Sequence, residues 1–518
     1  MQWDVIVIGG GLGGLTAGAM CARAGFRVLL LERNQTVGGA ATSFTLNSRA
    51  FEASLREMLD PATTLDPNNC VFNALDLFSK VDLVPIPQLY RVCAPHLDLD
   101  VTLPHGSEEL LGALSALFPE DREAIGAFLR HIQRSREAVG ILAERHNGAW
   151  WQGSALTLPL DFFALYRDFG ATLSSVMDRF FGDNERLKIA LAANLGHFTD
   201  DPDRFWWMTY AMLQGGYMEN GGCYVRGGSA QLSHAMADII VANGGHVRTN
   251  ATVERILVSS NGQAFGVALA GGEAFHGTML FGNAAPHALA AMLPEGPAEA
   301  VRATTARHAL SISLFEMHLG LNRPAADLGV RSYSTILIPD WMNSLSDFTQ
   351  ASAILGDMPG TRMPPVIVTD YGQIDSGLEH EGIAPMGVSG IDRLENWEGL
   401  DEATYHARKA AWQGALLDLL ERQWPGMTEA IDIAETSTAR TVASKLGTPG
   451  GAVYGYAPTP PRQALSGRVQ IRASTAVPGL WLASAFSGFG GYAGALASGA
   501  NAALSAVRAT MVDRQRRA

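Results

Sequence analysis

Three glycines near the start of the chain have the spacing of a phosphate-binding turn. Gly9, Gly11 and Gly14 form G-x-G-x-x-G between an apolar run over 4–8 and an Ala/Leu-rich helical pattern that continues to Arg23. In such a motif the first glycine makes a tight turn, the second lets a pyrophosphate approach the backbone, and the third lets the helix pack closely on the strand. The free N–H groups of the helix N-terminus would then bind the phosphates.

A carboxylate follows at the distance expected for ribose recognition. A second strand is predicted over 27–31, and it ends in Glu32, 18 residues after Gly14. An acidic side chain at this place accepts hydrogen bonds from a ribose 2′-hydroxyl and disfavours a 2′-phosphate. The strand, the spacing and the acid together favour a dinucleotide-binding unit over an ordinary glycine-rich loop.

A glycine pair extends this pattern into a longer signature. Glu32 and Arg33 are followed by Gly38, Gly39 and Ala40, and this run resembles ERxxxxGGxxxS/T. That is the FAD-binding signature of the family that contains phytoene desaturases, carotenoid isomerases, retinol saturases and, more distantly, amine oxidases. The resemblance implies FAD, in place of NAD, as the resident cofactor, with the glycine pair close to its diphosphate and ribityl chain.

Two further glycine-rich segments resemble later signatures of the same family. Residues 224–258 predict a loop, a helix over 230–242 and two short strands, and the resemblance implies that Val253 contacts the adenine end of FAD. Residues 478–503 resemble the closing signature, in which a strand over 480–483 leads to a glycine turn and to a helix that points at the flavin ring. Phe489 stands where proline is common. The predicted FAD site consists of Gly9, Gly11, Gly13, Gly14, Glu32, Arg33, Gly38, Gly39, Ala40, Val253, Ser484, Gly490 and Gly491.

Candidate catalytic side chains follow the glycine pair. Residues 51–56 (FEASLR) resemble the F-(D/E)-x-G-x-(H/T) segment that approaches the flavin in relatives, with Ser54 in place of the frequent glycine and Arg56 in place of the frequent histidine. Because arginine cannot act as a base at ordinary pH, Arg56 would act electrostatically or bind a carboxylate or carbonyl group. The alternative is a surface salt bridge. Glu52 and Tyr492 are the other two candidates.

Composition excludes several classes of protein. The 518 residues are 47% hydrophobic and 17% charged with a formal charge of −13, which fits neither a disordered chain nor a basic nucleic-acid binder. The four cysteines form no CxxC pair, which predicts a reducing compartment and no metal site. Residues 473–507 are uncharged but rich in Gly, Ser and Ala, and no signal-peptide pattern precedes 4–8, so we expect a cytoplasmic protein without a spanning helix.

Aromatic side chains concentrate between the first two glycine clusters. Residues 150–207 contain 12 aromatics, about 21% against 8% for the whole chain. They either form a helical core or line a tunnel for a lipophilic substrate, or 150–169 lies on a membrane surface as a peripheral anchor. Basic residues at 514, 516 and 517 could help such docking, although a solvated tail is the simpler interpretation.

The sequence therefore predicts an α/β fold: a Rossmann-type FAD-binding domain assembled from discontinuous segments, with an inserted α+β substrate domain. The FAD-binding segments are 1–95, 220–300 and 430–518. Residues 96–219 are expected to be helical and to face substrate or membrane. Residues 301–429 complete the substrate domain, with strands over 311–319 and 333–338 and a helix over 402–423.

The function that the resemblance implies is that of an FAD-dependent oxidoreductase. It would desaturate, saturate or isomerise carbon–carbon bonds of a lipophilic polyene or isoprenoid-like substrate by hydride transfer at the flavin. Two alternatives stay open: an amine-oxidase-like flavoprotein, and a non-catalytic prenyl-lipid carrier of the Rab GDP-dissociation-inhibitor type. The expected partner is a lipophilic small molecule, with peripheral membrane association as an option and without nucleic acid. The direction of the reaction, the electron acceptor and the oligomeric state are left open.

Overall fold

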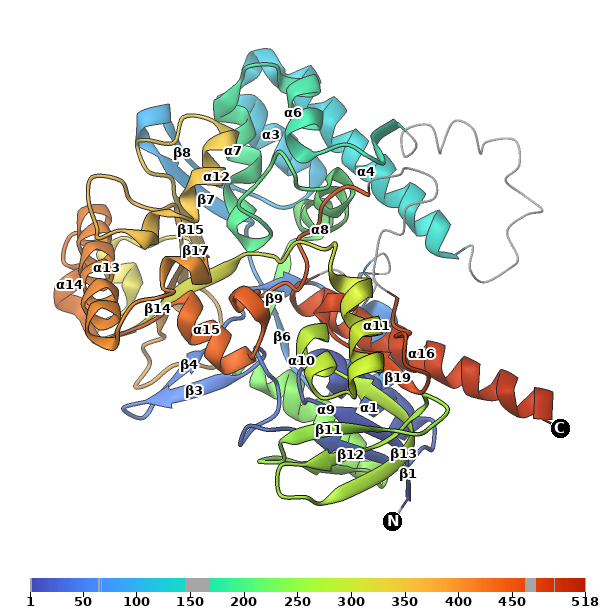
Figure 1. Ribbon diagram of the computed structural model, residues 1–518. Helices are drawn as coiled ribbons and strands as arrows, with labels where there is room; N and C mark the ends of the chain where they lie inside the picture. Colours follow the sequence, from blue (N-terminus) through green and yellow to red (C-terminus); the bar gives the residue numbers. More distant parts are fainter. Residues whose placement is uncertain are drawn as a thin grey trace, which may run out of the picture.

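The computed structural model describes residues 2–63, 66, 68–144, 167–461, 472–488 and 490–517 of the chain (Figure 1). Its described part contains two seven-stranded sheets. A hairpin pairs β3 with β4, and a three-stranded sheet has the order β5, β9, β6. The strands of these two smaller sheets are Ser43–Leu46, Arg49–Glu52, Met58–Leu59, Gly222–Val225 and Leu83–Pro85.

The first large sheet is the nucleotide-binding sheet. Its order is β10, β2, β1, β13, β12, β11, and β19 pairs in parallel with β13. β1 pairs in parallel with both β2 and β13, and Val5, Ile6 and Val7 of β1 have no exposed surface. Parallel strands that are buried on both faces are continuous apolar runs, as the sequence of β1 is. In the order of the sheet the strands are His246–Arg248, Val28–Leu31, Gln2–Ile8, Ala274–Gly282, Ala264–Leu269 and Val253–Val258, and β19 is Leu480–Leu482.

Helices cover both faces of this sheet. α1 (Leu12–Arg23), α9 (Ala230–Ala242) and α16 (Gly491–Arg517) pack on the face that carries Val5 and Val7. α10 (Pro286–Ala291) and α11 (Glu295–Thr305) pack on the opposite face. The predicted α/β fold with a Rossmann-type domain built from separate segments is confirmed.

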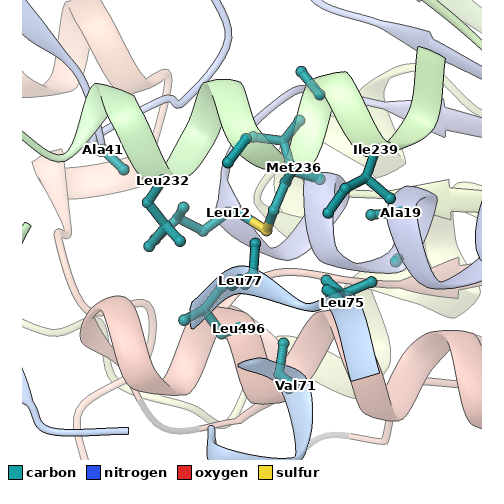
Figure 2. Close-up of a cluster of buried hydrophobic side chains, with 14 of the residues drawn as sticks. Leu12, Ala19, Ala41, Val71, Leu75, Leu77, Leu232, Met236, Ile239 and Leu496 are labelled. Atoms are coloured by element: carbon teal, nitrogen blue, oxygen red, sulfur yellow. The ribbon is translucent and has the colours of Figure 1, made fainter. Parts of the chain in front are cut away.

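The core beside α1 joins the two ends of the chain. Figure 2 shows Leu12 and Ala19 of α1 meeting Met236 of α9 and Leu496 of α16, and α2 (Asn69–Leu75) adds further side chains. The main chains of α1 and α16 are so close that a Cβ atom on Gly499 would overlap the carbonyl oxygen of Gly13. The C-terminal helix is therefore part of the nucleotide-binding domain.

The second large sheet has two different faces. Its order is β18, β14, β17, β16, β15, β7, β8. Phe315 and Met317 of β14 pack on one face against α13 (Glu402–Gln423). Glu316 and His318 point to the other face, toward the β3–β4 hairpin, where the ring of His318 lies 4.9 Å from that of Phe44. The strands are Ile431–Ser437, Ser313–Leu321, Met386–Asp392, Val366–Asp370, Ser334–Leu337, Tyr90–Ala94 and Leu99–Leu103.

A helical layer lies beside this second sheet. Phe128, Phe181, Trp207 and Tyr210 cluster there, and the ring of His131 stacks on Trp207 at 5.2 Å. The described part of the aromatic-rich segment, from Phe169 onward, thus contributes to a helical core. The helices of the layer are α3 (Ser107–Leu117), α4 (Arg122–Glu144), α6 (Leu173–Phe181), α7 (Glu185–Ala192) and α8 (Trp207–Asn220), and shorter helices elsewhere are α12 (Phe348–Ala351), α14 (Met427–Ala430) and α15 (Ala439–Leu446).

Several predictions fall outside what the structure describes. Residues 145–166, which include most of the suggested membrane anchor, are not described, and neither are Phe489 and the side chains of 514, 516 and 517. Among the residues that are described, no helix combines the length and the apolar character that a membrane span needs. Peripheral membrane association therefore stays a prediction.

The predicted element boundaries agree with the observed ones to different degrees. The helices over 230–242 and 402–423 have the predicted bounds, whereas the strand expected over 311–319 runs from Ser313 to Leu321. The shift arises because Ser311 N donates a hydrogen bond to the Gly455 carbonyl at 3.0 Å instead of joining the β14 ladder. The boundaries predicted for the FAD-binding segments at residues 95 and 430 lie next to β7 and β18, and both of these strands belong to the second sheet.

The contact between α1 and α16 predicts a stability effect. Gly499→Ala places a methyl group against the Gly13 carbonyl, and we expect it to lower the free energy of unfolding by about 1–3 kcal/mol. Gly414→Ala is the matched control, because Gly414 is exposed on α13 with no atom near its Cβ position, and there alanine should stabilise by up to about 1 kcal/mol. Urea unfolding of both variants measures the difference. Equal effects of the two substitutions would contradict the close packing.

Candidate cofactor and active site

The first glycine motif makes the tight turn that its spacing predicts. Gly9 has a φ of +99°, and its N–H donates to the Leu31 carbonyl at 2.8 Å, which joins the end of β1 to the end of β2. A Cβ atom on Gly14 would overlap the carbonyl oxygen of Gly9. The turn thus leads from β1 into α1 without side chains of its own at Gly9, Gly10 and Gly11.

The glycine pair lies directly on this turn. Gly38 N donates to the Gly10 carbonyl at 2.7 Å, and Gly11 and Gly38 form an isolated parallel bridge. Gly38 and Gly39 have φ values of +119° and +63°, which glycine adopts without strain. The two motifs that the sequence places 24 residues or more apart therefore form one continuous surface of glycine backbone.

Glu32 is buried beside both motifs. Its carboxylate accepts hydrogen bonds from Gly10 N at 2.7 Å and from Asn34 N at 2.8 Å. The Glu32 carbonyl accepts from Ala251 N at 2.8 Å, which brings the start of β11, with Val253, alongside. Arg33 turns away instead, because its guanidinium donates to the Lys445 carbonyl at 2.8 Å.

The C-terminal segment completes the same surface. Asn283 Nδ2 donates to the Ala483 carbonyl at 2.7 Å, and a Cβ on Gly13 would overlap that carbonyl. Next to it, Ser484 is 3% exposed, and its hydroxyl has no hydrogen-bond partner among the described residues. A buried hydroxyl without a partner beside crowded glycine backbone fits the polar diphosphate and ribityl groups of a dinucleotide.

The residues expected at the flavin ring also meet. The Ala40 carbonyl accepts hydrogen bonds from Ser54 Oγ at 2.7 Å and from Tyr492 Oη at 3.3 Å, and these two hydroxyls are 3.0 Å apart. Burial raises the pKa of Tyr492 well above its ordinary value, so its hydroxyl stays protonated. Gly490 and Gly491 precede this tyrosine at the start of α16. The structure thus brings the first glycine motif, the glycine pair and the C-terminal glycine segment to one site.

Glu52 is held by an unusually complete set of donors. One oxygen accepts from Ser54 N, Leu55 N and Ser229 Oγ at 3.2, 3.1 and 2.7 Å. The other accepts from Ser229 N at 2.7 Å and Tyr224 Oη at 3.3 Å. Burial raises the pKa of Glu52, and the hydrogen bonds from Ser229, Leu55 and Ser54 oppose this increase. The carboxylate ties the segment after the glycine pair to the N-terminus of α9.

Arg56 is not a surface residue, so the surface salt bridge considered for it is wrong. The second sheet covers the guanidinium, which is 6% exposed and lies over Gly387, where a Cβ atom would be 3.3 Å from it. Its Nη1 donates to Tyr371 Oη at 2.9 Å, and its Nη2 lies 3.2 Å from Glu316 Oε1. The Nε donor has no hydrogen-bond partner in the described part of the chain.

Glu316 and His318 were not among the residues predicted for the site. Both come from β14, two residues apart and hence on one face, and Glu316 Oε2 lies 3.8 Å from His318 Nε2. Burial raises the pKa of Glu316 to about 7, and burial together with the Arg56 charge lowers the pKa of His318 to about 3. Two ionisable residues at alternate positions of a predicted strand without other charged residues were the available signal.

No metal centre emerges from the part of the chain that the structure describes, since its histidine, cysteine and carboxylate side chains form no cluster able to hold an ion.

The site consists of a dinucleotide-binding surface next to a buried, charged and aromatic wall. Fold and site together define a two-domain protein with a Rossmann-like nucleotide-binding domain.

Comparisons with known proteins agree with this class. The family model described as NAD(P)-binding Rossmann-like domain matches residues 7–76. Prolycopene isomerase, chloroplastic, of Daucus carota is 23% identical over 465 residues, which cover 89% of this chain and 72% of that protein. Phytoene desaturase (neurosporene-forming) of Cereibacter sphaeroides is 26% identical over 465 residues, covering 88% and 85%. All-trans-retinol 13,14-reductase of Danio rerio is 21% identical over 528 residues, covering 95% and 84%.

Solved structures show the same fold over nearly the whole chain. An oxidoreductase from Methanosarcina mazei superposes with a TM-score of 0.62 at 17% identity, covering 98% of this chain and 100% of the other. A putrescine oxidase variant gives a TM-score of 0.63 at 14% identity and covers 99% of each chain. Over most of its length the chain is similar to proteins named prolycopene isomerase, phytoene desaturase and all-trans-retinol 13,14-reductase, as its motifs predict. The predicted class of an oxidoreductase and the fold of an FAD-binding protein are confirmed.

The hydrogen bonds of Glu52 predict a structural effect. Glu52→Gln puts an NH2 group where an accepting oxygen now faces several donors, and we expect it to lower the free energy of unfolding by about 2 kcal/mol or more. The same change at Glu435, which is exposed on β18, should stay within about 0.5 kcal/mol of the wild type. Chemical denaturation measures both. A loss at Glu52 no larger than that at Glu435 would contradict the anchoring role.

Proposed function

We propose that this chain is an FAD-dependent oxidoreductase that acts on carbon–carbon bonds of a lipophilic polyene or isoprenoid-like substrate. The observation that carries the proposal is the meeting of the first glycine motif, the glycine pair and the C-terminal glycine segment beside Glu32 and the unpartnered Ser484 hydroxyl. Relatives over most of the chain are named prolycopene isomerase, phytoene desaturase and retinol 13,14-reductase, which supports this substrate class. Desaturation, saturation and isomerisation are all within the proposal.

The residues of the site have distinct proposed roles toward FAD. The N-terminus of α1, with Gly11 and Gly13, would hold the pyrophosphate, because free N–H groups and the helix dipole favour anions there. Glu32 would accept hydrogen bonds from the adenosine ribose, with Val253 near the adenine. Gly38 to Ala40 would face the ribityl chain, and Gly490, Gly491 and the start of α16 the ring. Bound FAD supplies the acceptor or donor of hydride.

The other wall of the site fits a lipophilic substrate with electrostatic help from Arg56. Apolar and aromatic side chains of the helical layer pack against the second sheet, and Arg56, Tyr371 and Glu316 are among the polar groups between the sheet and the glycine turns. A buried guanidinium with an unused Nε donor can orient a carbonyl or carboxylate group or stabilise negative charge. Glu52 would position the loop that carries Arg56.

The absorption spectrum of the purified protein, reconstituted with FAD where needed, tests the cofactor. We expect flavin bands and release of FAD on denaturation. Anaerobic turnover with phytoene, all-trans-retinol and prolycopene then separates desaturase, saturase and isomerase activity. A protein that binds no FAD contradicts the proposal, and a colourless preparation loaded with prenyl lipid would favour the carrier alternative.

Gly11→Ala tests the proposed pyrophosphate site. The new methyl group would meet the Asn283 side-chain oxygen at 2.5 Å, and that flexible side chain can move, so the apoprotein should fold normally. The methyl group also takes the space through which a pyrophosphate approaches, and we expect affinity for FAD to fall about tenfold or more, a loss of about 1.4 kcal/mol. Fluorescence titration with FAD measures the affinity. Gly271→Ala, in open space, is the control, and unchanged affinity of Gly11→Ala would contradict the assignment.

A further inference from the structure

The buried cluster around Arg56 contains more carboxyl groups than cations. Glu316 forms an ion pair with Arg56 at 3.2 Å, and Glu52 acts on the same guanidinium through its charge. All three side chains are buried, with at most 6% of their surface exposed. One guanidinium cannot neutralise two carboxylates in a site removed from water, so the environment favours a proton on one of them.

Hydrogen bonding decides which carboxyl group takes this proton. Five N–H and O–H donors point at the two oxygens of Glu52, and donors of this kind stabilise the ionised form. Glu316 has Arg56 Nη2 at 3.2 Å and the ring nitrogen of His318 at 3.8 Å, beyond hydrogen-bond distance. Glu316 is therefore the carboxyl group that gains and loses a proton near neutral pH.

The other titratable groups that face this cluster do not compete for the proton. Burial lowers the pKa of His197 to about 4 and that of His318 to about 3, and the charge of Arg56 acts in the same direction, so both imidazoles are neutral at pH 7. Burial raises the pKa of the surrounding phenols, which keep their protons. These are Tyr224, Tyr333, Tyr371, Tyr454 and Tyr492.

Glu316 lies across from the glycine turns that are expected at the flavin ring. Its partner Arg56 is two residues from Ser54, whose hydroxyl contacts Tyr492 at 3.0 Å. Gly490 packs so tightly on Tyr454 that a Cβ atom there would overlap the tyrosine, and the charge of Glu316 acts on Tyr454. A substrate between the second sheet and these turns would have Glu316 on one side and the cofactor on the other.

We propose that Glu316 is the catalytic acid and base that exchanges a proton with the substrate carbon next to the carbon that exchanges hydride. This inference rests on the proposed function. In saturation, the π bond of C=C breaks, hydride from reduced flavin forms one C–H bond, and the Glu316 proton forms the other, which leaves a carboxylate beside Arg56. In desaturation, the carboxylate takes the proton while hydride leaves for the oxidised cofactor. Isomerisation needs the proton to be added and removed without net redox change.

Infrared spectra of the FAD-loaded protein between pH 5 and 9 test the protonation. Because burial also raises the pKa values of Glu57, Asp66 and Asp392, the Glu316 band is measured as the wild-type spectrum minus that of Glu316→Gln. We expect this difference to contain a carboxylic-acid band that disappears with a midpoint near 7, and the corresponding difference for Glu435→Gln to contain none. Thermal melting at each pH gives a second, independent measurement, the stability of the folded protein. Because the pKa of Glu316 is raised in the folded state, the wild type should lose stability relative to Glu316→Gln as the pH rises from 5 to about 7, and the difference should level off above that pH. A wild-type-minus-Glu316→Gln difference spectrum without such a band overturns the assignment, whether or not any substrate turns over.

Stopped-flow kinetics with phytoene, all-trans-retinol and prolycopene test the catalytic role. For a compound that the wild type converts, we expect Glu316→Gln to lower kcat about 100-fold or more with little change in KM or FAD content. Glu316→Asp should restore part of kcat with a shifted pH profile, and Glu435→Gln should match the wild type. Unchanged kcat and pH profile in Glu316→Gln would overturn the role. Absence of FAD, or no conversion of any compound by the wild type, would instead count against the proposed function.

Discussion

Close approach of main chains around residues 9–14 is the constraint on which the rest of the structure depends. The turn after β1 is touched by Gly38 from one segment and by two parts of the C-terminal segment, the Ala483 carbonyl and Gly499 of α16. A Cβ atom on Gly13 would overlap the Ala483 carbonyl, and one on Gly499 would overlap the Gly13 carbonyl. Glycines that are far apart in the sequence therefore belong to one surface.

The second constraint is electrostatic. Where the nucleotide-binding domain meets the second sheet, Glu52, Arg56 and Glu316 are buried with only one cation among them. Hydrogen-bond donors from its own loop and from the N-terminus of α9 stabilise the negative charge of Glu52. The carboxylate that lacks a compensating positive charge or enough donors is therefore Glu316. The same interface that places Gly387 over Arg56 thus raises the pKa of the Glu316 carboxyl group to about 7. The cofactor-binding surface and the Glu316 side chain both depend on how the nucleotide-binding domain packs against the second sheet.

Local patterns predicted the nucleotide-binding domain well. Strand, turn, helix and acid follow one another within 4–32, and α9 and α13 have strong start and stop signals, so their bounds needed no tertiary information. The side of the site that the second sheet forms could not be predicted in this way. Glu316 comes near Arg56 only through pairing of strands that are distant in sequence, and the burial of Arg56 depends on a glycine at 387 on another strand. No local pattern encodes these contacts, and the surface interpretation of Arg56 failed for that reason.

A crystal structure of the protein with FAD tests the central claim most directly, because the claim concerns where one extended molecule contacts three separated segments. We expect the pyrophosphate against the backbone N–H groups at Gly11 and Gly13, a ribose hydroxyl on Glu32, and the ring beside Gly490 and Gly491. An FAD molecule bound elsewhere, or one whose pyrophosphate does not touch residues 9–14, would contradict the account.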